Sequence, residues 1–249
     1  MQTLLTLIRR ELATYFVSFT GYVIMAAATF LIGLGFYVLV RNLGNEPSPM
    51  PVTEMFYSTF FFWLLPLLAS PVITMRLFAL EKHSGTFETL MTTPVSDIQV
   101  VTAKFVAAMI FYVVMWLPML GCLFLVQRYS TQEGLDWVTV GTTYLGVFLV
   151  GGLYLSLGCF ASAITRSQTV AAMVTFVLGI TLFALAFLAG QVPASNELQS
   201  QVLNYFALFQ HMNDFARGIV GTQPIIFYIS VTGFFLFLTL RAVESRRWR

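Results

Sequence analysis

Few residues in this chain have the type and spacing that catalysis requires. The sequence contains no G-x-x-x-x-G-K-[ST] loop for nucleotide phosphates, no H-E-x-x-H zinc motif and no G-x-S-x-G nucleophile turn. Ser156 comes nearest to the last pattern because Gly158 follows it, but Tyr154 stands where the first glycine belongs. The two histidines, His83 and His211, are far apart in the sequence. These residues predict a chain that is not an enzyme and holds no catalytic, cofactor or metal site of its own.

The composition indicates why such chemistry is scarce. Hydrophobic residues make up 58% of the 249 residues and charged residues 10%, with a mean hydropathy of +0.82. A typical soluble domain is about 25% charged, so this chain cannot cover a soluble surface. The net charge of +2 is too small to favour nucleic acid. The composition predicts an integral membrane protein.

Charged residues delimit six long apolar stretches. Each is long enough for the roughly 20 residues that cross a bilayer, and each is continuously apolar, which favours helices over barrel strands. A cleavable signal peptide in the first stretch is disfavoured, because the apolar run continues well past Ala26–Ala28. The expected fold is a single all-α polytopic transmembrane domain over 1–249. The expected spans are 21–40, 58–75, 105–126, 138–164, 169–189 and 225–240.

The basic residues predict the orientation. An even number of spans puts both termini on one side, and ten of the thirteen lysines and arginines then share that side. Basic residues concentrate in cytoplasmic loops, so both termini are expected in the cytoplasm. His83 and His211 fall on opposite sides and cannot share a metal ion. The spans hold almost no ionisable groups, which argues against an ion-coupled carrier.

Residues 3–19 form an amphipathic pattern ahead of the first span. The apolar residues fall within about a third of the helical wheel, which is typical of a helix lying in the membrane surface. The alternative is that this segment is the polar start of span one. The stripe consists of Leu4, Leu5, Ile8, Leu12, Tyr15, Phe16 and Phe19.

The longest cytoplasmic segment, 76–104, could contain two short helices. Ser84 can cap the first and Pro94 follows its end, while the second begins at Ser96. Phe87, with Leu90 and Met91, would face the cytoplasm with nothing in this chain to bury it, which favours a docking surface over a solvated connector. The outer segment 191–223 is too apolar for a free loop and too broken for a span, so we expect interfacial or re-entrant helices there.

Three stretches resemble the permease subunits of type-2 ABC transporters, most closely the gliding-motility-type permeases. They are Arg9–Leu12, then Thr74–Leu90 with Thr93-Pro94-Val95, and His211–Val220 before the last span. The resemblance covers nearly the whole chain, and the second stretch is the most specific. Leu80 departs from the pattern, since a second acidic residue is common there.

The resemblance implies a type-2 ABC exporter transmembrane-domain fold and a role for each stretch. The segment within 76–104 would be the coupling helix that docks on the ATPase subunit, with Glu81, Lys82, Ser84, Gly85, Thr86, Phe87, Glu88, Leu90, Met91 and Pro94 as its residues. The amphipathic start would be the interface helix, with Arg9, Arg10 and Glu11. The outer re-entrant region would contain His211, Phe215, Arg217 and Gly218. Candidate residues lining the path are Phe61, Phe62, Trp63, Phe176 and Phe183.

The resemblance also implies the partners. Two permease chains, identical or close paralogues, would work with two ABC ATPase subunits that bind ATP and Mg²⁺, so this chain would bind no cofactor. The protein would sit in a bacterial inner membrane and export or extract a substrate, with an aromatic path suited to an amphipathic or lipid-linked cargo. A periplasmic accessory protein would also be compatible, and no nucleic acid is expected. The alternative is a mechanotransmitting scaffold, which relays ATPase motion to a periplasmic partner without moving cargo.

Overall fold

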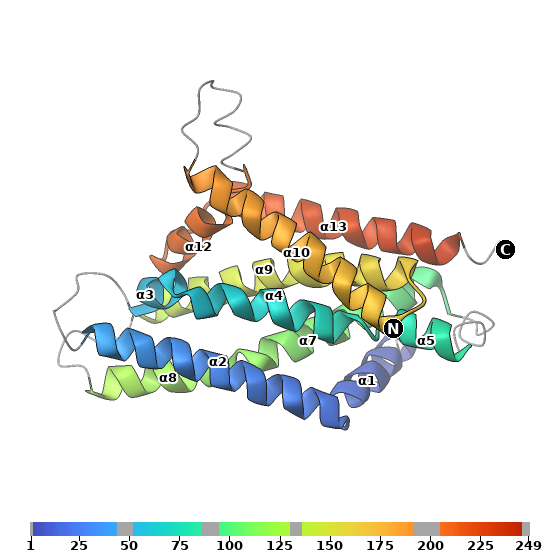
Figure 1. Ribbon diagram of the computed structural model, residues 1–249, viewed down its shortest axis with the longest axis horizontal. Helices are drawn as coiled ribbons and strands as arrows, with labels where there is room; N and C mark the ends of the chain where they lie inside the picture. The colour runs from blue at the N-terminus through green and yellow to red at the C-terminus, as the bar shows by residue number, and fades with distance from the viewer. Residues whose placement is uncertain (1, 44–51, 86–94, 130–135, 192–204, 246–249) are drawn as a thin grey trace, which may run out of the picture.

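The computed structural model describes residues 2–43, 52–85, 95–129, 136–191 and 205–245, in which regular secondary structure is entirely helical (Figure 1). Six candidate spans in these ranges are long and apolar enough to cross a membrane. The predicted all-α polytopic fold with six spans is confirmed. The spans contain α2 (Phe19–Leu43), α4 (Phe60–Thr74), α7 (Asp97–Met115) with α8 (Leu117–Tyr129), α9 (Trp137–Ile164), α10 (Gln168–Gln191) and α13 (Thr222–Glu244). The candidate span that contains α4 extends from Phe60 to Ser84 and also includes the short helix after α4.

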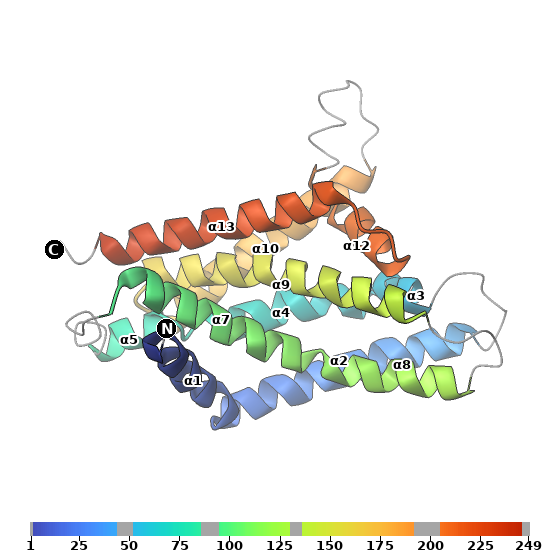
Figure 2. The same ribbon diagram turned by 180° about the vertical axis from the view of Figure 1, so that it is seen from behind.

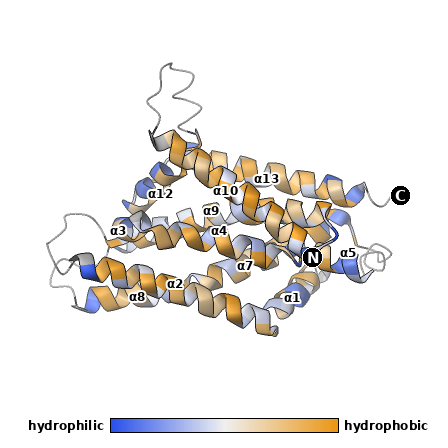
Figure 3. Ribbon diagram, viewed as in Figure 1, coloured by the Kyte–Doolittle hydropathy of each residue, from blue (hydrophilic) through white to orange (hydrophobic). Residues whose placement is uncertain are grey.

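Four shorter helices lie at the two ends of the bundle. They are α1 (Gln2–Phe16), α3 (Val52–Ser58), α5 (Ala79–Ser84) and α12 (Leu208–Ala216). Both chain termini and α5 lie at one end of the long axis, whereas α3 and α12 lie at the other (Figures 1 and 2). Hydrophobic residues predominate along the spans and hydrophilic residues gather near their ends, as expected for a helix bundle in a bilayer (Figure 3).

Helix α9 lies at the centre of the bundle. It contacts α4, α7, α10, α12 and α13, and 83% of its most apolar stretch is buried, against 11% for α13. Glycines on α9 allow this burial, because a glycine at a contact position lets the neighbouring helix approach closely. A Cβ atom at Gly151 would overlap the ring of Tyr112 in α7, and one at Gly158 would overlap the side chain of Thr74 in α4.

Helices α1 and α2 are separated by a bend at Val17 and Ser18. Figure 2 shows α1 running obliquely to the spans, packed on α7. The segment is therefore a separate helix, which favours the interface-helix interpretation over a simple extension of span one.

Two local expectations for segment 76–104 were wrong. The helix that begins after Ser96 is not short: the Ser96–Gln99 capping box, with both hydrogen bonds at 3.3 Å, starts α7, which continues into the third span. Ser84 does not start a helix but is the last residue of α5, with Gly85 at a φ of 74° as its C-cap. Residues 86–94, over which the predicted helix would run, lie outside the described residues.

The packing of α9 generates a first prediction. Gly158→Ala should lower the free energy of unfolding by about 1–3 kcal/mol, because its methyl group would displace Thr74 or separate α9 from α4. The matched control is Gly141→Ala on the same helix, where no atom lies within 4 Å of the new Cβ and helix propensity alone predicts stabilisation of about 0.5–1 kcal/mol. Thermal unfolding of the purified proteins in detergent measures both. Equal effects of the two variants would contradict the close α4–α9 contact.

Candidate functional site

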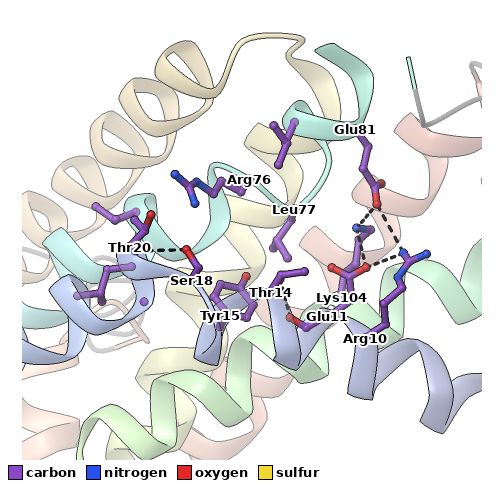
Figure 4. Close-up of a pocket in the computed structure, with 14 residues that line it drawn as sticks. Arg10, Glu11, Thr14, Tyr15, Ser18, Thr20, Arg76, Leu77, Glu81 and Lys104 are labelled. Atoms are coloured by element: carbon purple, nitrogen blue, oxygen red, sulfur yellow. Dashed lines mark hydrogen bonds and ion pairs between the residues drawn. The ribbon is translucent and has the colours of Figure 1, made fainter. Parts of the chain in front are cut away.

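At the end of the bundle that carries the termini, three helices bring opposite charges together. The Lys104 Nζ of α7 donates to Oε1 of Glu11 in α1 at 3.2 Å and to Oε1 of Glu81 in α5 at 2.8 Å (Figure 4). The exposed fraction is 3% for the Lys104 side chain, 9% for Glu11 and 19% for Glu81. We call Arg10, Glu11, Glu81 and Lys104 the ion cluster.

Arg10 closes the ion cluster on its solvent side. Its Nη2 donates to Oε1 of Glu11 at 2.8 Å and lies 3.7 Å from Oε1 of Glu81. The hydrogen bond with Glu11 raises the pKa of Arg10, against the opposing effect of burial, and the charges of Glu11 and Glu81 act in the same direction. Two carboxylates thus face two cations, and the formal charge of the ion cluster is zero.

Burial makes the ion cluster a strong geometric constraint. Moving a lone ammonium group out of water costs several kcal/mol, so a buried lysine is tolerated only where carboxylates surround it in good geometry. The carboxylates on Lys104 come from two other helices, and Nζ also lies 5.5 Å from the ring centroid of Phe78. Satisfying Lys104 therefore requires α1, α5 and α7 to hold one mutual arrangement.

Helix α5 is attached separately to the end of α9. The Oγ of Ser162 accepts from the backbone N–H groups of Phe78 and Ala79, both at 3.1 Å, which caps the start of α5. The Nζ of Lys82 donates to the carbonyl oxygen of Ala163, one of the last carbonyls of α9. Helix α5 is thus tied to α9 by Ser162 and Lys82, and to α1 and α7 by Glu81.

The predicted docking residues divide into three groups. Glu81 and Lys82 bind other helices of the same chain, so the structure gives them a positioning role. Ser84 and Gly85 are exposed at the end of α5. The remaining residues of the prediction lie outside the described residues; they are Thr86, Phe87, Glu88, Leu90, Met91 and Pro94.

Helix α1 presents its polar residues unevenly. Glu11 is buried in the face that packs on α7, whereas Arg9 is exposed and Leu5 of the predicted apolar stripe is 63% exposed. Tyr15 lies one turn beyond Glu11, stacks on Phe111 with ring centroids 4.9 Å apart, and donates its hydroxyl to the Ile73 carbonyl at 3.0 Å. Burial raises the pKa of Tyr15 well above its usual value, so this hydroxyl stays protonated and remains a donor.

At the opposite end, α12 is held by α3 and α9. Arg217 donates from Nε and Nη2 to Oε1 of Glu54, at 2.9 and 2.5 Å, and this hydrogen bonding raises the pKa of Arg217. Thr53 of α3 donates to the Ala216 carbonyl at 2.9 Å, and Thr142 of α9 donates to the Phe215 carbonyl at 2.7 Å. The C-terminus of α12 is thereby fixed against both neighbours. Gly218 follows with a φ of 83°, a left-handed conformation that suits glycine.

The predicted outer residue His211 lies among aromatic side chains. It is 5% exposed and its ring packs against those of Phe227 and Tyr228. Over the ranges that the structure describes, no group of three or more histidine, cysteine, aspartate or glutamate side chains is arranged to hold a metal ion.

The five candidate path residues do not share one surface. Phe62 and Trp63 are buried inside the chain, where Phe62 packs on Trp116 with ring centroids 5.2 Å apart. Phe61 and Phe183 are half-buried, whereas Phe176 on α10 is 36% exposed. Phe62 and Trp63 thus support the bundle from within, and Phe176 is left facing outward.

The fold defines a polytopic helical membrane protein. At each end of the bundle a short helix, α5 or α12, is hydrogen-bonded to the central span α9. A profile of the family described as "ABC-2 family transporter protein" matches residues 12–244, and the chain belongs to this family. It is therefore a multi-pass membrane permease subunit of an ABC transporter, a class that works with an ATPase subunit. No curated protein matches the chain.

Sequence reasoning missed the importance of Lys104, Glu54 and Thr142. Lys104 and Glu54 each stand beside an apolar stretch and were treated as boundary charges, although a boundary charge can also be buried against another helix. The sequence did contain a signal for the burial of Glu11. It lies one helical turn before Tyr15 of the apolar stripe, which puts its carboxylate on the packed face of α1.

The ion cluster generates a second prediction. Lys104→Met should lower the free energy of unfolding by about 3 kcal/mol, because it removes the buried cation and leaves Glu11 and Glu81 with only the half-exposed Arg10 as a partner. Arg241→Met is the matched control, since Arg241 pairs with Glu244 on an exposed face and should cost about 1 kcal/mol or less. Thermal unfolding in detergent measures both losses.

A neutral triple variant separates charge from packing. Adding Glu11→Gln and Glu81→Gln to Lys104→Met removes the unpaired charges and should recover most of the lost stability. A loss in Lys104→Met no larger than in Arg241→Met, or no recovery in the triple variant, would contradict the role given to the ion cluster.

Proposed function

We propose that this permease subunit dimerises and docks on separate ATPase subunits through a cytoplasmic coupling helix within residues 81–93, and that it exports or extracts an amphipathic or lipid-linked substrate. The observation that carries the proposal is the attachment of α5 to three other helices, through Glu81 to Arg10 of α1 and Lys104 of α7, and through Lys82 to α9. A force applied at residues 86–94 would reach the bundle through these contacts. ATP and Mg²⁺ belong to the ATPase in this proposal, and this chain binds no cofactor.

Three features support the coupling role of α5. Ser162 caps its start, Lys82 binds the end of α9, and Gly85 ends it with a left-handed residue. A helix of six residues would be unstable alone, so it owes its position to these contacts. An element held in this way moves with its attachments, which is what transmission from an ATPase requires.

The second permease chain and the path belong to the same proposal. Helix α10 has 22% of its most apolar stretch buried, and its exposed face includes Phe176 and Phe187. These aromatic side chains are available to a path between two copies, and the proposal includes the half-buried Phe61 and Phe183. We assign Phe62 and Trp63 to the support of that surface, because they are buried within one chain.

The proposed location is a bacterial inner membrane with both termini in the cytoplasm. The support is the ten-to-three distribution of basic residues, together with the position of α5 at the same end as both termini (Figure 1). An ATPase in the cytoplasm could then reach the segment after α5.

A mechanotransmitting scaffold is the second candidate, and the contacts of α9 favour it. One end of α9 holds α5 through Ser162 and Ala163, and the other end holds α12 through Thr142. A displacement of α9 would therefore reach the outer end of the bundle whether or not cargo moves. In that case α12 and the residues around Arg217 would contact a periplasmic protein.

The docking proposal generates a third prediction. Glu88→Arg and Leu90→Asp should each reduce recovery of the ATPase at least tenfold, because they change charge and polarity in the proposed contact. The measurement is affinity purification of the tagged chain from membranes that also contain the P-loop ATPase that co-purifies with the wild type. Membrane insertion should be unchanged.

The control variant for docking is Glu244→Arg. It makes the same charge reversal at the end of α13, on the same proposed side of the membrane, and should leave ATPase recovery unchanged. Normal ATPase recovery with both Glu88→Arg and Leu90→Asp would reject this segment as the docking site.

The role of α9 generates a fourth prediction. In the complex with its ATPase in lipid nanodiscs, a non-hydrolysable ATP analogue should change hydrogen exchange in α12, and Thr142→Val should abolish most of that change. The matched control is Thr181→Val. The Thr181 hydroxyl donates to the Val177 carbonyl of the same helix, so this variant should leave the response intact. Equal responses in both variants would contradict transmission through Thr142.

A transport assay distinguishes the two candidates. ATP-dependent movement of nitrobenzoxadiazole-labelled phosphatidylethanolamine in vesicles, lost with Glu88→Arg, would favour the permease. An ATP response in α12 without movement of this lipid would favour the mechanotransmitter.

A further inference from the structure

A cavity of about 520 Å³ lies beside the ion cluster, where α1, α2, α5 and α7 meet the end of α4 (Figure 4). One side is polar and contains the ion cluster. The other side is apolar and includes Ile24, Val72, Leu77 and Leu80. The cavity thus combines a charged end with an apolar wall, which is the pattern that an amphiphile fits.

The charges around this cavity leave one cation in excess. Arg10, Glu11, Glu81 and Lys104 sum to zero, and Arg76 adds a fifth charge to the lining. Arg76 is exposed and makes no ion pair with any residue of the described ranges. The cavity therefore has a net positive charge and is complementary to a ligand with a single negative charge.

The position of Arg76 separates this charge from the ion cluster. Figure 4 shows its guanidinium directed toward Thr20 and Ser18, on the opposite side of the cavity from the Glu11 and Glu81 carboxylates. Thr20 and Ser18 lie at the bend between α1 and α2, where the Thr20 N–H donates to the Ser18 hydroxyl at 3.2 Å. A guanidinium beside hydroxyl groups is a suitable partner for a phosphate oxygen.

The surroundings of the cavity indicate a lipid rather than a free anion. Val17 and Phe19 at the bend are 82% and 84% exposed, and Tyr22 is 62% exposed one turn further along α2. Residues at the ends of three spans meet here, so the cavity lies at the level of the membrane surface. A phospholipid whose phosphodiester is held by Arg76 could thus extend its acyl chains along the exposed face of α2.

We propose that this cavity binds the headgroup of an anionic phospholipid, with Arg76 holding the phosphodiester and Leu77 and Leu80 contacting the glycerol backbone. Assignment to the cytoplasmic leaflet, where anionic lipids concentrate, rests on the proposed orientation. The bound lipid would fill the space between α1, α2 and α5 and would stabilise the arrangement that the ion cluster maintains. It is a resident lipid at the side of one chain, not the cargo.

The test measures lipid binding to the purified full chain in detergent, without an ATPase, by native mass spectrometry and by the shift in unfolding temperature. Palmitoyl-oleoyl phosphatidylglycerol should bind the wild type at least tenfold more tightly than palmitoyl-oleoyl phosphatidylcholine. Arg76→Gln should remove most of this preference, and Arg76→Lys should keep part of it. Because Arg76 is exposed, both variants should fold as the wild type does.

Arg9→Gln is the matched control, because it removes one exposed positive charge from the same end of the chain outside the cavity. It should retain the phosphatidylglycerol preference. An equal loss in Arg9→Gln and Arg76→Gln would overturn the proposal in favour of general electrostatic attraction. Inorganic phosphate that stabilises the wild type as much as phosphatidylglycerol would overturn it in favour of an anion site.

The outcomes also distinguish this proposal from the proposed function. If Glu88→Arg loses ATPase recovery but binds phosphatidylglycerol normally, docking and lipid binding are separate properties, and both proposals stand. Absence of any phosphatidylglycerol preference in a chain that still recovers its ATPase would reject the lipid site and leave the docking proposal standing.

Discussion

The arrangement at one end of this molecule depends on a buried ammonium group. Lys104 must meet both Glu11 and Glu81, because the free energy of removing its charge from water is large and only close carboxylates offset it. The two carboxylates belong to α1 and α5, so the requirement fixes an amphipathic helix and a six-residue helix against the third span. Neither short helix has enough internal hydrogen bonds to hold such a position alone.

Helix α9 extends this constraint through the bundle. Its glycines admit neighbouring helices at close range, so it is the most buried span and contacts elements at both ends. Ser162 and Ala163 hold α5 at one end, and Thr142 holds α12 at the other. The same helix therefore connects the segment proposed to receive force with the segment proposed to deliver it, which is a property that transport and mechanotransmission both require.

The spans could be predicted from the sequence because each depends on an uninterrupted apolar stretch, a local property. The helix before span one was also expected, although Glu11 on its buried face was not recognised as part of a cluster. The start of α5 at Ala79 could not be predicted from local residue types, because the N–H groups of Phe78 and Ala79 are bonded by Ser162, over 80 residues later in the chain. The burial of Phe62 and Trp63 could not be inferred either, because it depends on the rotation of α4 against its neighbours.

The sequence by itself determined that this chain crosses a membrane with six helices, since so few charged residues leave no other way to place its apolar surface. It also determined the family to which the chain belongs, because that resemblance rests on short stretches of residues. The tertiary structure alone decided which charges meet. Glu11 and Lys104 are 93 residues apart, and Glu81 and Lys104 are 23 apart. Their contacts exist only when separate helices dock, and no local pattern specifies that docking.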